Sequence, residues 1–219
     1  MKILALETSA VTASVAVTED EKLLAQSFQN SGLTHSATLM PMVADLLKNT
    51  GITMENIDVI AVAAGPGSFT GIRIGVAAAK GLAWPEDKLC APCSTLESMA
   101  WQCAHMDGEI CVAMDARRKQ VYNARFAAKD GVITRLSEDR AIGVDKLVDE
   151  VKHTGKPQIL VGDGAQLCYN AFKDAGIPAV MMPPHLVYQT AWGVARAALE
   201  LARQDKLIPA GQKYTWELC

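Results

Sequence analysis

A glycine-rich stretch from Gly65 to Gly81, G-P-G-S-F-T-G-I-R-I-G-V-A-A-A-K-G, contains the residue types and spacing closest to a ligand site. It follows an apolar run over residues 59–64 that is typical of a buried strand. Its first glycines and proline end that strand, and Ser68 can cap a following helix. A strand, a glycine turn and a helix N-terminus together form a geometry that binds anions. Gly65, Gly67 and Ser68 are therefore candidate nucleotide-binding residues, although a tight turn alone also explains the glycines.

The spacing of this stretch departs from the common nucleotide motifs. A Walker loop needs Lys and Ser or Thr after its last glycine, and here Ile72 and Arg73 follow Gly71. The dinucleotide pattern G-x-G-x-x-G has one residue fewer between its last two glycines. A phosphate site therefore stays an open alternative.

Small residues form one face of the helix that follows. The face comprises Gly71, Gly75, Ala78, Ala79 and Leu82, at spacings of three, four, seven and eight. So smooth a face allows another backbone to approach closely, and each glycine costs up to ~1 kcal/mol of helix propensity relative to alanine. The face packs either on the sheet of the same chain or on a partner helix.

Composition excludes several classes of protein. The chain has 219 residues, 50% hydrophobic and 21% charged, which fits a globular protein with one large or two small domains. A net charge of −3 argues against strong independent binding of nucleic acid. We expect no signal peptide and no membrane span, and therefore a cytoplasmic protein.

Two cysteines, Cys90 and Cys93, form a C-x-x-C pair. A redox pair should open a helix from the end of a strand, whereas here Ser94 and Glu97 follow as the capping box of the next helix. We expect both cysteines to be small buried residues at a strand end. No second pair exists to complete a zinc site, and we predict no bound metal.

The order of expected elements occurs twice along the chain. Each half reads strand, strand, strand, helix, strand, helix, strand, which predicts an α/β protein with two tandem ribonuclease-H-like or actin-like domains. Each domain has a mixed five-stranded sheet with helices, over residues 1–105 and 106–219. This is the plan of the actin, Hsp70 and sugar-kinase (ASKHA) superfamily, in which an acidic residue after the first strand holds the metal of a bound nucleotide. The further candidate nucleotide-binding residues are then Glu7, Thr8 and Ser9 after the first strand and Gly162 and Gly164 in a later glycine turn.

Five segments together resemble the TsaB family, formerly YeaZ, and the resemblance covers nearly the whole chain. The most specific is A-G-P-G-S-F-T-G-I-R-I-G at 64–75. The others are I-L-A-L-E-T-S-A at 3–10, T-H-S-A-T-L-M-P at 34–41, S-T-L-E at 94–97 and M-D-A-R-R-K-Q-V-Y at 114–122. The segment after residue 210 departs from the family pattern.

The resemblance implies a scaffold subunit of the bacterial machinery that attaches threonylcarbamoyl to the adenosine beside the anticodon of tRNA. Such a subunit is non-catalytic, pairs with its catalytic paralogue TsaD, works with the ATPase TsaE, and forms a homodimer when TsaD is absent. It needs no cofactor of its own, with ATP or ADP only at the partner interface, and it meets tRNA only within the complex. The helices over 36–49 and 71–83 carry the partner contact. The residues assigned to that contact are His35, Leu39, Met42, Val43, Leu46, Gly71, Arg73, Gly75, Ala78, Ala79 and Leu82.

The residues themselves also favour a non-catalytic chain. The four histidines are at 35, 105, 153 and 185, and no two are spaced four apart, as two histidines that hold a metal from one helix turn to the next would be. No G-x-S-x-G nucleophile elbow occurs either. This argues against a peptidase. A stand-alone ATP-dependent phosphotransferase remains the alternative, motivated by Glu7 and the glycine turns.

A local cluster of positive charge is formed by the basic run Arg117-Arg118-Lys119. One interpretation is that this run and Arg73 contact tRNA phosphates within a complex. Solvated charges on a turn are the competing interpretation, because the patch is small and the chain is acidic.

Overall fold

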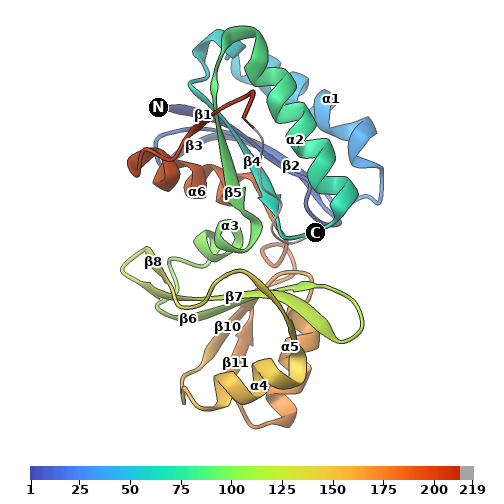
Figure 1. Cartoon of the computed structure of the whole chain (residues 1–219), viewed down its shortest axis with the longest axis vertical. Helices are drawn as coiled ribbons and strands as arrows, with labels where there is room; N and C mark the ends of the chain where they lie inside the picture. The colour runs from blue at the N-terminus through green and yellow to red at the C-terminus, as the bar shows by residue number, and fades with distance from the viewer. Residues whose placement is uncertain (213–219) are drawn as a thin grey trace. The chain divides into compact units, whose positions relative to one another are not determined.

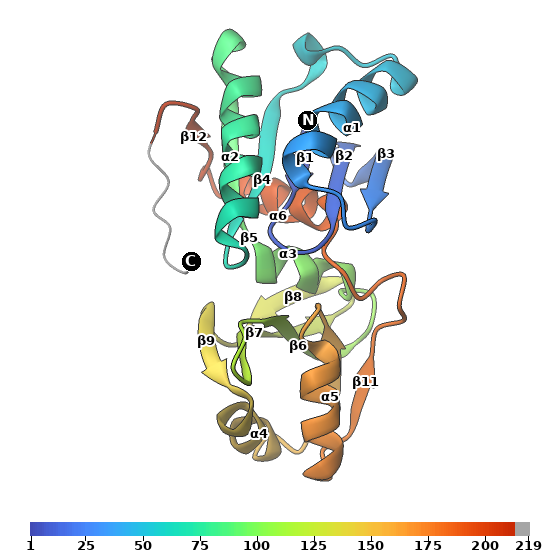
Figure 2. The ribbon, with the colours of Figure 1, turned by 90° about the vertical axis from the view of Figure 1, so that its right-hand side faces the viewer.

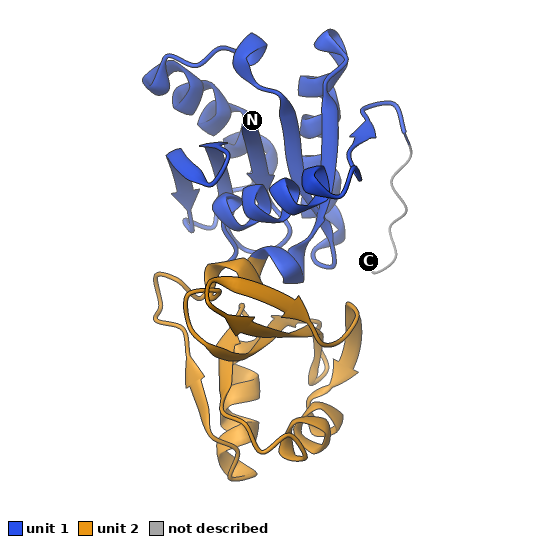
Figure 3. Ribbon diagram, turned by 90° about the vertical axis from the view of Figure 1, so that its left-hand side faces the viewer, with its two compact units in different colours: residues 1–98, 189–217, 219 blue, residues 99–188, 218 orange. Residues whose placement is uncertain are grey.

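The computed structural model describes residues 1–212, so most of the atypical tail, residues 213–219, lies outside the described residues. The chain forms two compact units, which Figure 3 distinguishes by colour. Within the described residues, unit 1 comprises Met1–Ser98 together with residues 189–212, and unit 2 comprises Met99–Tyr188. Each unit is built around its own sheet.

The sheet of unit 1 has six strands in the order β12-β5-β4-β1-β2-β3. Strands β1, β4 and β5 are parallel to one another, and β2 and β3 continue the sheet as antiparallel strands. The bounds are β1 Lys2–Glu7, β2 Ala13–Glu19, β3 Lys22–Gln29, β4 Val59–Gly65, β5 Leu89–Ser94 and β12 Ile208–Pro209.

The sheet of unit 2 repeats this plan, with the order β11-β10-β6-β7-β8 and with β9 paired to β7. The pairs β10–β6 and β10–β11 are parallel, and β6–β7 and β7–β8 are antiparallel, as at the equivalent positions of unit 1. The bounds are β6 Gly108–Asp115, β7 Gln120–Lys129, β8 Val132–Arg135, β9 Arg140–Gly143, β10 Gln158–Val161 and β11 Ala179–Met181. The predicted duplication is therefore confirmed, with one strand more in each sheet than the predicted five.

Six α-helices and two 3-10 turns complete the described chain, and Figure 1 labels the helices. The bounds are α1 His35–Thr50, α2 Phe69–Ala83, α3 Thr95–Gln102, α4 Val144–Lys152, α5 Ala165–Asp174 and α6 Ala191–Arg203, with the turns at Met54–Asn56 and Trp84–Glu86. In unit 2, α4 and α5 pack against each other, and α5 covers β6, β10 and β11.

In unit 1, α1 and α2 cover one face of the sheet and α6 covers the other (Figure 1). A core of aliphatic side chains fills the space under α1 and α2, including Leu4, Leu6, Val62, Ile72 and Val76. No helix of the described residues is long and apolar enough to cross a membrane.

The predicted domain boundary, which placed all of residues 106–219 in the second domain, differs from the structure, because helix α6 belongs to unit 1. Seven of its thirteen residues are buried, and it packs on β1, β2 and β5 of the first sheet. The reason is physical: α1 and α2 cover only one face of that sheet, and an apolar helix from the end of the chain covers the face that would otherwise meet water. The order of elements along the chain does not predict that α6 packs on the first sheet.

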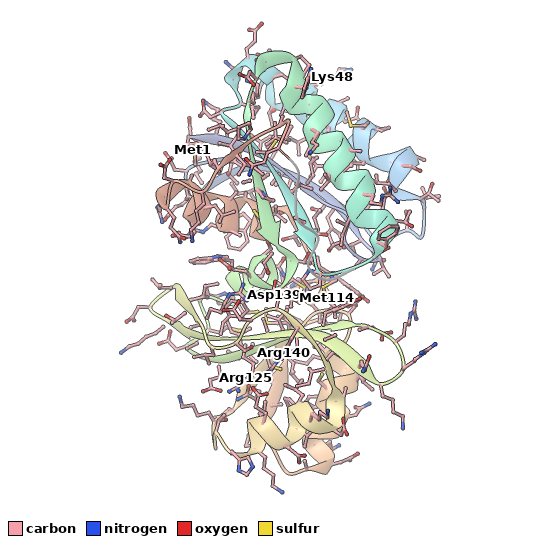
Figure 4. The ribbon with its side chains drawn as sticks, viewed as in Figure 1. Met1, Lys48, Met114, Arg125, Asp139 and Arg140 are labelled. Carbon is pink, nitrogen blue, oxygen red and sulfur yellow. The ribbon has the colours of Figure 1, made fainter. Side chains whose placement is uncertain are left out.

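An ion-pair network links the strands of unit 2 to α4. The side chain of Arg125 lies 2.9 Å from Glu109 and 2.9 Å from Glu150, and Arg140 lies 2.8 Å from Glu150. Figure 4 labels both arginines. The hydrogen bond from Arg140 lowers the pKa of Glu150. Burial opposes the charged form of Glu109, but hydrogen bonds from Gln158, Arg125 and Lys156 outweigh it and lower the pKa of that carboxyl as well.

This network predicts an acid-sensitive unit 2. Because the folded-state pKa values of Glu109 and Glu150 are lowered, their stabilisation is fully present above the unfolded-state pKa and is lost as the pH falls through the folded-state values. We expect the free energy of opening of β6 and β7, measured by amide hydrogen exchange, to fall by about 1.5 kcal/mol, the value for a hydrogen bond to a charged group, as the pH drops below 4.5. The variant Glu109→Gln should show a smaller fall, and an equal fall would contradict this assignment.

Candidate partner-binding surface

The turn between β4 and α2 folds as the glycine pattern predicts. The side chain of Ser68 accepts a hydrogen bond from Gly71 N–H at 3.3 Å, which caps the first turn of α2. The backbone N–H of Ser68 donates to the carbonyl oxygen of Ser9 at 2.6 Å. The loop therefore lies directly against the end of β1 in the same unit.

The glycines of α2 face the sheet of their own unit. A Cβ added at Gly71 would overlap the carbonyl oxygen of Thr8, and one added at Gly75 would lie 2.5 Å from the Thr8 side-chain oxygen. Thr8 Oγ1 also donates to the carbonyl oxygen of Gly71 at 2.8 Å. Gly71, Gly75 and Ala79 are buried. The small-residue stripe therefore packs on the sheet of its own chain, which is the first of the two alternatives above. The prediction that these three residues contact a partner is not met, because they are covered by this sheet.

The residues after β1 are also enclosed. Glu7, Thr8 and Ser9 have no exposed surface, and Glu7 accepts a hydrogen bond from Ser9 N–H at 2.5 Å. A Cβ added at Gly67 would overlap the carbonyl oxygen of Ser9. The predicted phosphate-binding groups of unit 1 therefore lie together as expected, but the N–H groups of Ser68 and Gly71 bind acceptors of this chain.

Unit 2 has the same close approach at the ends of β6 and β10. A Cβ at Gly162 would overlap the carbonyl oxygen of Ala113, and Gly164 N–H donates to that oxygen at 3.0 Å. Asp163 accepts from the N–H of Asp115 at 3.1 Å. Burial, together with the nearby Asp115 carboxylate, raises the pKa of Asp163. Gly162 and Gly164 thus serve packing between strand ends, as their counterparts do in unit 1.

Helix α1 presents a mixed set of the predicted contact residues. Leu39, Val43 and Leu46 are 1–5% exposed and belong to the core under the helix, so the prediction that they touch a partner is wrong. Their spacing of four and three residues is that of a core-facing stripe of an amphipathic helix. His35 is half-buried, with Nε2 2.7 Å from the carbonyl oxygen of Ala10, and Met42 is half-buried.

The outward side of α2 carries a continuous strip of exposed residues, which we call the outer face of α2. It comprises Phe69, Arg73, Ala77 and Gly81, spaced four apart, together with Trp84 directly after the helix. Phe69 is 57% exposed and Trp84 is 69% exposed. The guanidinium carbon of Arg73 lies 4.8 Å from the centroid of the Phe69 ring. Two aromatic residues therefore stand at either end of a nearly smooth centre.

Sequence reasoning found only Arg73 of this outer face. Ala78 and Leu82, also predicted to contact a partner, are half-buried and flank it. Helical periodicity fixes which residues share a face but does not say which of two small-residue faces meets the sheet. The exposed Phe69 and Trp84, at the two ends of the helix, were the available signal, because large aromatic residues on a surface often mark an interface.

Strand β12 and the residues after it lie beside α2 (Figure 2). Lys80 Nζ donates to the carbonyl oxygen of Gln212 at 2.8 Å, and a Cβ added at Gly211 would lie 3.4 Å from the Trp84 ring. These contacts fix the segment after α6 beside the last turn of α2.

The basic run forms the tip of the β6–β7 hairpin in unit 2. Arg117, Arg118 and Lys119 are exposed, and their φ angles are 67°, 52° and 59°. A left-handed conformation costs a residue with a side chain roughly 1–2 kcal/mol. Hydrogen bonds from Arg117 N–H to Asp115 at 2.7 Å and from Val144 N–H to the Lys119 carbonyl oxygen at 3.1 Å hold the tip.

The five cysteines of the described residues are all buried. Burial raises the pKa of the Cys93 thiol well above its usual value, and Cys93 lies within hydrogen-bond distance, 3.5 Å, of the carbonyl oxygen of Val194. Such a thiol is a packing group, as predicted, rather than a reactive one. Among residues 1–212, no three His, Cys, Asp or Glu side chains gather in a way that could hold a metal ion.

Solved structures place the duplicated fold among actin-like ATPases and sugar kinases. A YeaZ structure from Pseudomonas aeruginosa superposes with a TM-score of 0.81 at 24% identity, covering 98% of this chain and 99% of that one. The ROK hexokinase of Thermus thermophilus superposes with a TM-score of 0.51 at 11% identity, covering 94% of this chain and 100% of that one. The units and their strand order therefore define the actin-like (ASKHA) fold.

The sequence comparisons narrow this class to one family. The model of a family described as "TsaD: tRNA N6-adenosine threonylcarbamoyltransferase" matches residues 23–191. The tRNA threonylcarbamoyladenosine biosynthesis protein TsaB of Bacillus subtilis is 33% identical over 80% of this chain and 76% of that protein. TsaB of Escherichia coli is 32% identical over 81% and 78%. The chain belongs to the TsaB family.

Proposed function

We propose that this chain is a non-catalytic subunit of the machinery that makes threonylcarbamoyladenosine in tRNA, acting by pairing with a TsaD-family transferase. The observation that carries the proposal is the outer face of α2. It combines an exposed aromatic residue at each end with a centre of Ala77 and Gly81, where no atom lies within 4 Å of a Cβ added at Gly81. A partner helix can approach so smooth a centre closely, while Phe69 and Trp84 supply the large apolar contacts that dominate interface energies.

The rigid base of α2 supports this role. Gly71 and Gly75 lock the inward side of the helix onto Thr8 and Val62, so the outward side is held on a well-packed element. A preorganised surface loses less conformational entropy when a partner binds. Helix α1 packs beside α2 and exposes Met40, 44% accessible, as a further apolar contact.

The closed loops at the strand ends support a non-catalytic chain. In unit 1 the N–H groups of Ser68 and Gly71 donate to oxygens of Ser9 and Ser68, and Thr8 and Ser9 are fully buried. A nucleotide at this place would have to displace backbone contacts that the glycines were needed to make. The transfer chemistry is then carried out by the partner. ATP or ADP binds only at the interface of the pair, and the pair recruits the ATPase TsaE. Without its partner the chain uses the same face to form a homodimer in the cytoplasm.

A reconstituted transfer assay tests the proposal. Threonylcarbamoyl incorporation into tRNA should require both this chain and the TsaD of the same organism, and the chain alone should give none. Glu7→Gln keeps a hydrogen-bond acceptor for Ser9 N–H and should leave the reconstituted rate within about twofold. Activity of this chain in the absence of TsaD, or loss of the rate with folded Glu7→Gln, would contradict a non-catalytic role.

A stand-alone ATP-dependent phosphotransferase is the second candidate, favoured by the acidic Glu7 at the end of β1 in a fold shared with a hexokinase. It predicts Mg²⁺-dependent heat on adding ATP, and weaker binding in Glu7→Ala. Unchanged heat flow with the isolated chain would rule this candidate out.

A further inference from the structure

Three adjacent basic side chains stand at the tip of the β6–β7 hairpin and have no part in the partner contact proposed above. In the β6–β7 hairpin, Arg117 has a carboxylate nearby, at 3.7 Å from Asp115. No carboxylate of the described residues lies within 4.0 Å of Arg118 or Lys119. Figure 1 shows the hairpin reaching out beyond α4 and α5 of the same unit. We propose that Arg118 and Lys119, with Arg117, form a contact site for the phosphodiester backbone of RNA.

The backbone of the tip explains why the charges are displayed in this way. Three consecutive left-handed residues are rare outside glycine, and surrounding structure must hold them. Here Asp163 binds Asp115 N–H, Asp115 binds Arg117 N–H, and Lys119 accepts from Val144 N–H. The carboxylates of Asp115 and Asp163 thereby anchor the backbone of the tip, and neither forms an ion pair with Arg118 or Lys119.

The chemistry of the tip fits phosphate groups. A guanidinium presents a planar fork of donors that matches phosphate, and a lysine adds a mobile point charge. Exposed cations of this kind contact the backbone of a nucleic acid and carry no sequence information. Because the chain has a net charge of −3, such a site strengthens RNA binding chiefly within an assembly and is weak in the isolated chain. The inference rests on the proposed function only for the choice of RNA.

The test is the affinity of tRNA for the full-length chain, alone at low salt and mixed with its TsaD at about 100 mM salt, compared with R118N/K119N. Asparagine tolerates the left-handed conformation, so this variant removes two charges and keeps the tip. The control K152N/K173N removes two exposed lysines from the ends of α4 and α5 and changes the net charge equally.

We expect R118N/K119N to weaken tRNA binding by about fivefold or more and to lower the slope of log affinity against log salt by about 2, with the control unchanged. Equal losses in both variants would mean that only net charge matters, and no loss in either setting would overturn the site. The mass of the chain–TsaD mixture is measured in parallel by light scattering. If R118N/K119N changed that mass and not tRNA affinity, the tip would contact protein and the inference would be wrong. Failure of the wild-type pair to form would count against the proposed function alone, because the low-salt measurement uses the chain by itself.

Discussion

Gly71→Ala should destabilise unit 1 by at least about 3 kcal/mol, whereas Gly81→Ala in the same helix should stabilise it by up to about 1 kcal/mol. At Gly71 the new methyl group would overlap a backbone carbonyl oxygen, that of Thr8, which no rotamer change can relieve. At Gly81 no atom lies within 4 Å of the added group, so only the gain in helix propensity remains.

Amide hydrogen exchange of β1 and β4 is the suitable measurement, because it reports the opening of unit 1 separately from unit 2. The two variants differ only in which side of α2 receives the methyl group, so they test the orientation of the helix. Similar effects of the two substitutions would contradict the packing of α2 on the end of β1.

Ala77→Arg should weaken binding to the TsaD partner by about a hundredfold, which corresponds to about 2.8 kcal/mol. Ala77 is exposed at the centre of the outer face of α2, where a large cation would hold a partner helix away and would be buried without an acceptor. Isothermal titration calorimetry of TsaD with the wild-type chain, and then with the Ala77→Arg variant, measures the two affinities.

The matched control is Ala141→Arg, which places the same side chain at an exposed alanine of β9 in unit 2. It should leave the affinity unchanged, and both variants should keep the stability of the wild-type chain. If the two substitutions weakened binding equally, or if neither did, the interface would lie elsewhere. Gly75→Trp is no substitute for this experiment, because a side chain there would collide with Thr8 and Val62 and unfold the helix.

Local patterns predicted most of the fold correctly. The turn of glycines and Pro66, the cap at Ser68 and the duplicated order of elements depend on interactions within a few residues or within one sheet, and the sequence records them directly. The strand β9 was missed because it is only four residues long and lies in a charged segment. The return of α6 to the first sheet depends on which face of a distant sheet lacks cover, and no local pattern encodes that.

The candidate site was predicted less well than the fold. Leu39, Val43 and Leu46 were assigned to a partner through the family resemblance, which points to a helix but does not say which of its faces is exposed, and these three side chains pack in the core. The stripe of Gly71 and Gly75 has the same ambiguity, which only the contact with Thr8 resolves. The left-handed tip at Arg117 could not be foreseen, since arginine and lysine have no preference for positive φ.

Light scattering on this chain mixed with the TsaD of its own organism shows whether the two proteins pair. We expect each protein's own oligomer to be replaced by a species with the mass of one chain of each, and we expect Ala77→Arg to prevent this while Ala141→Arg does not. A mixture in which the wild-type chain keeps its own mass and TsaD keeps its own would contradict the claim that this chain works by pairing.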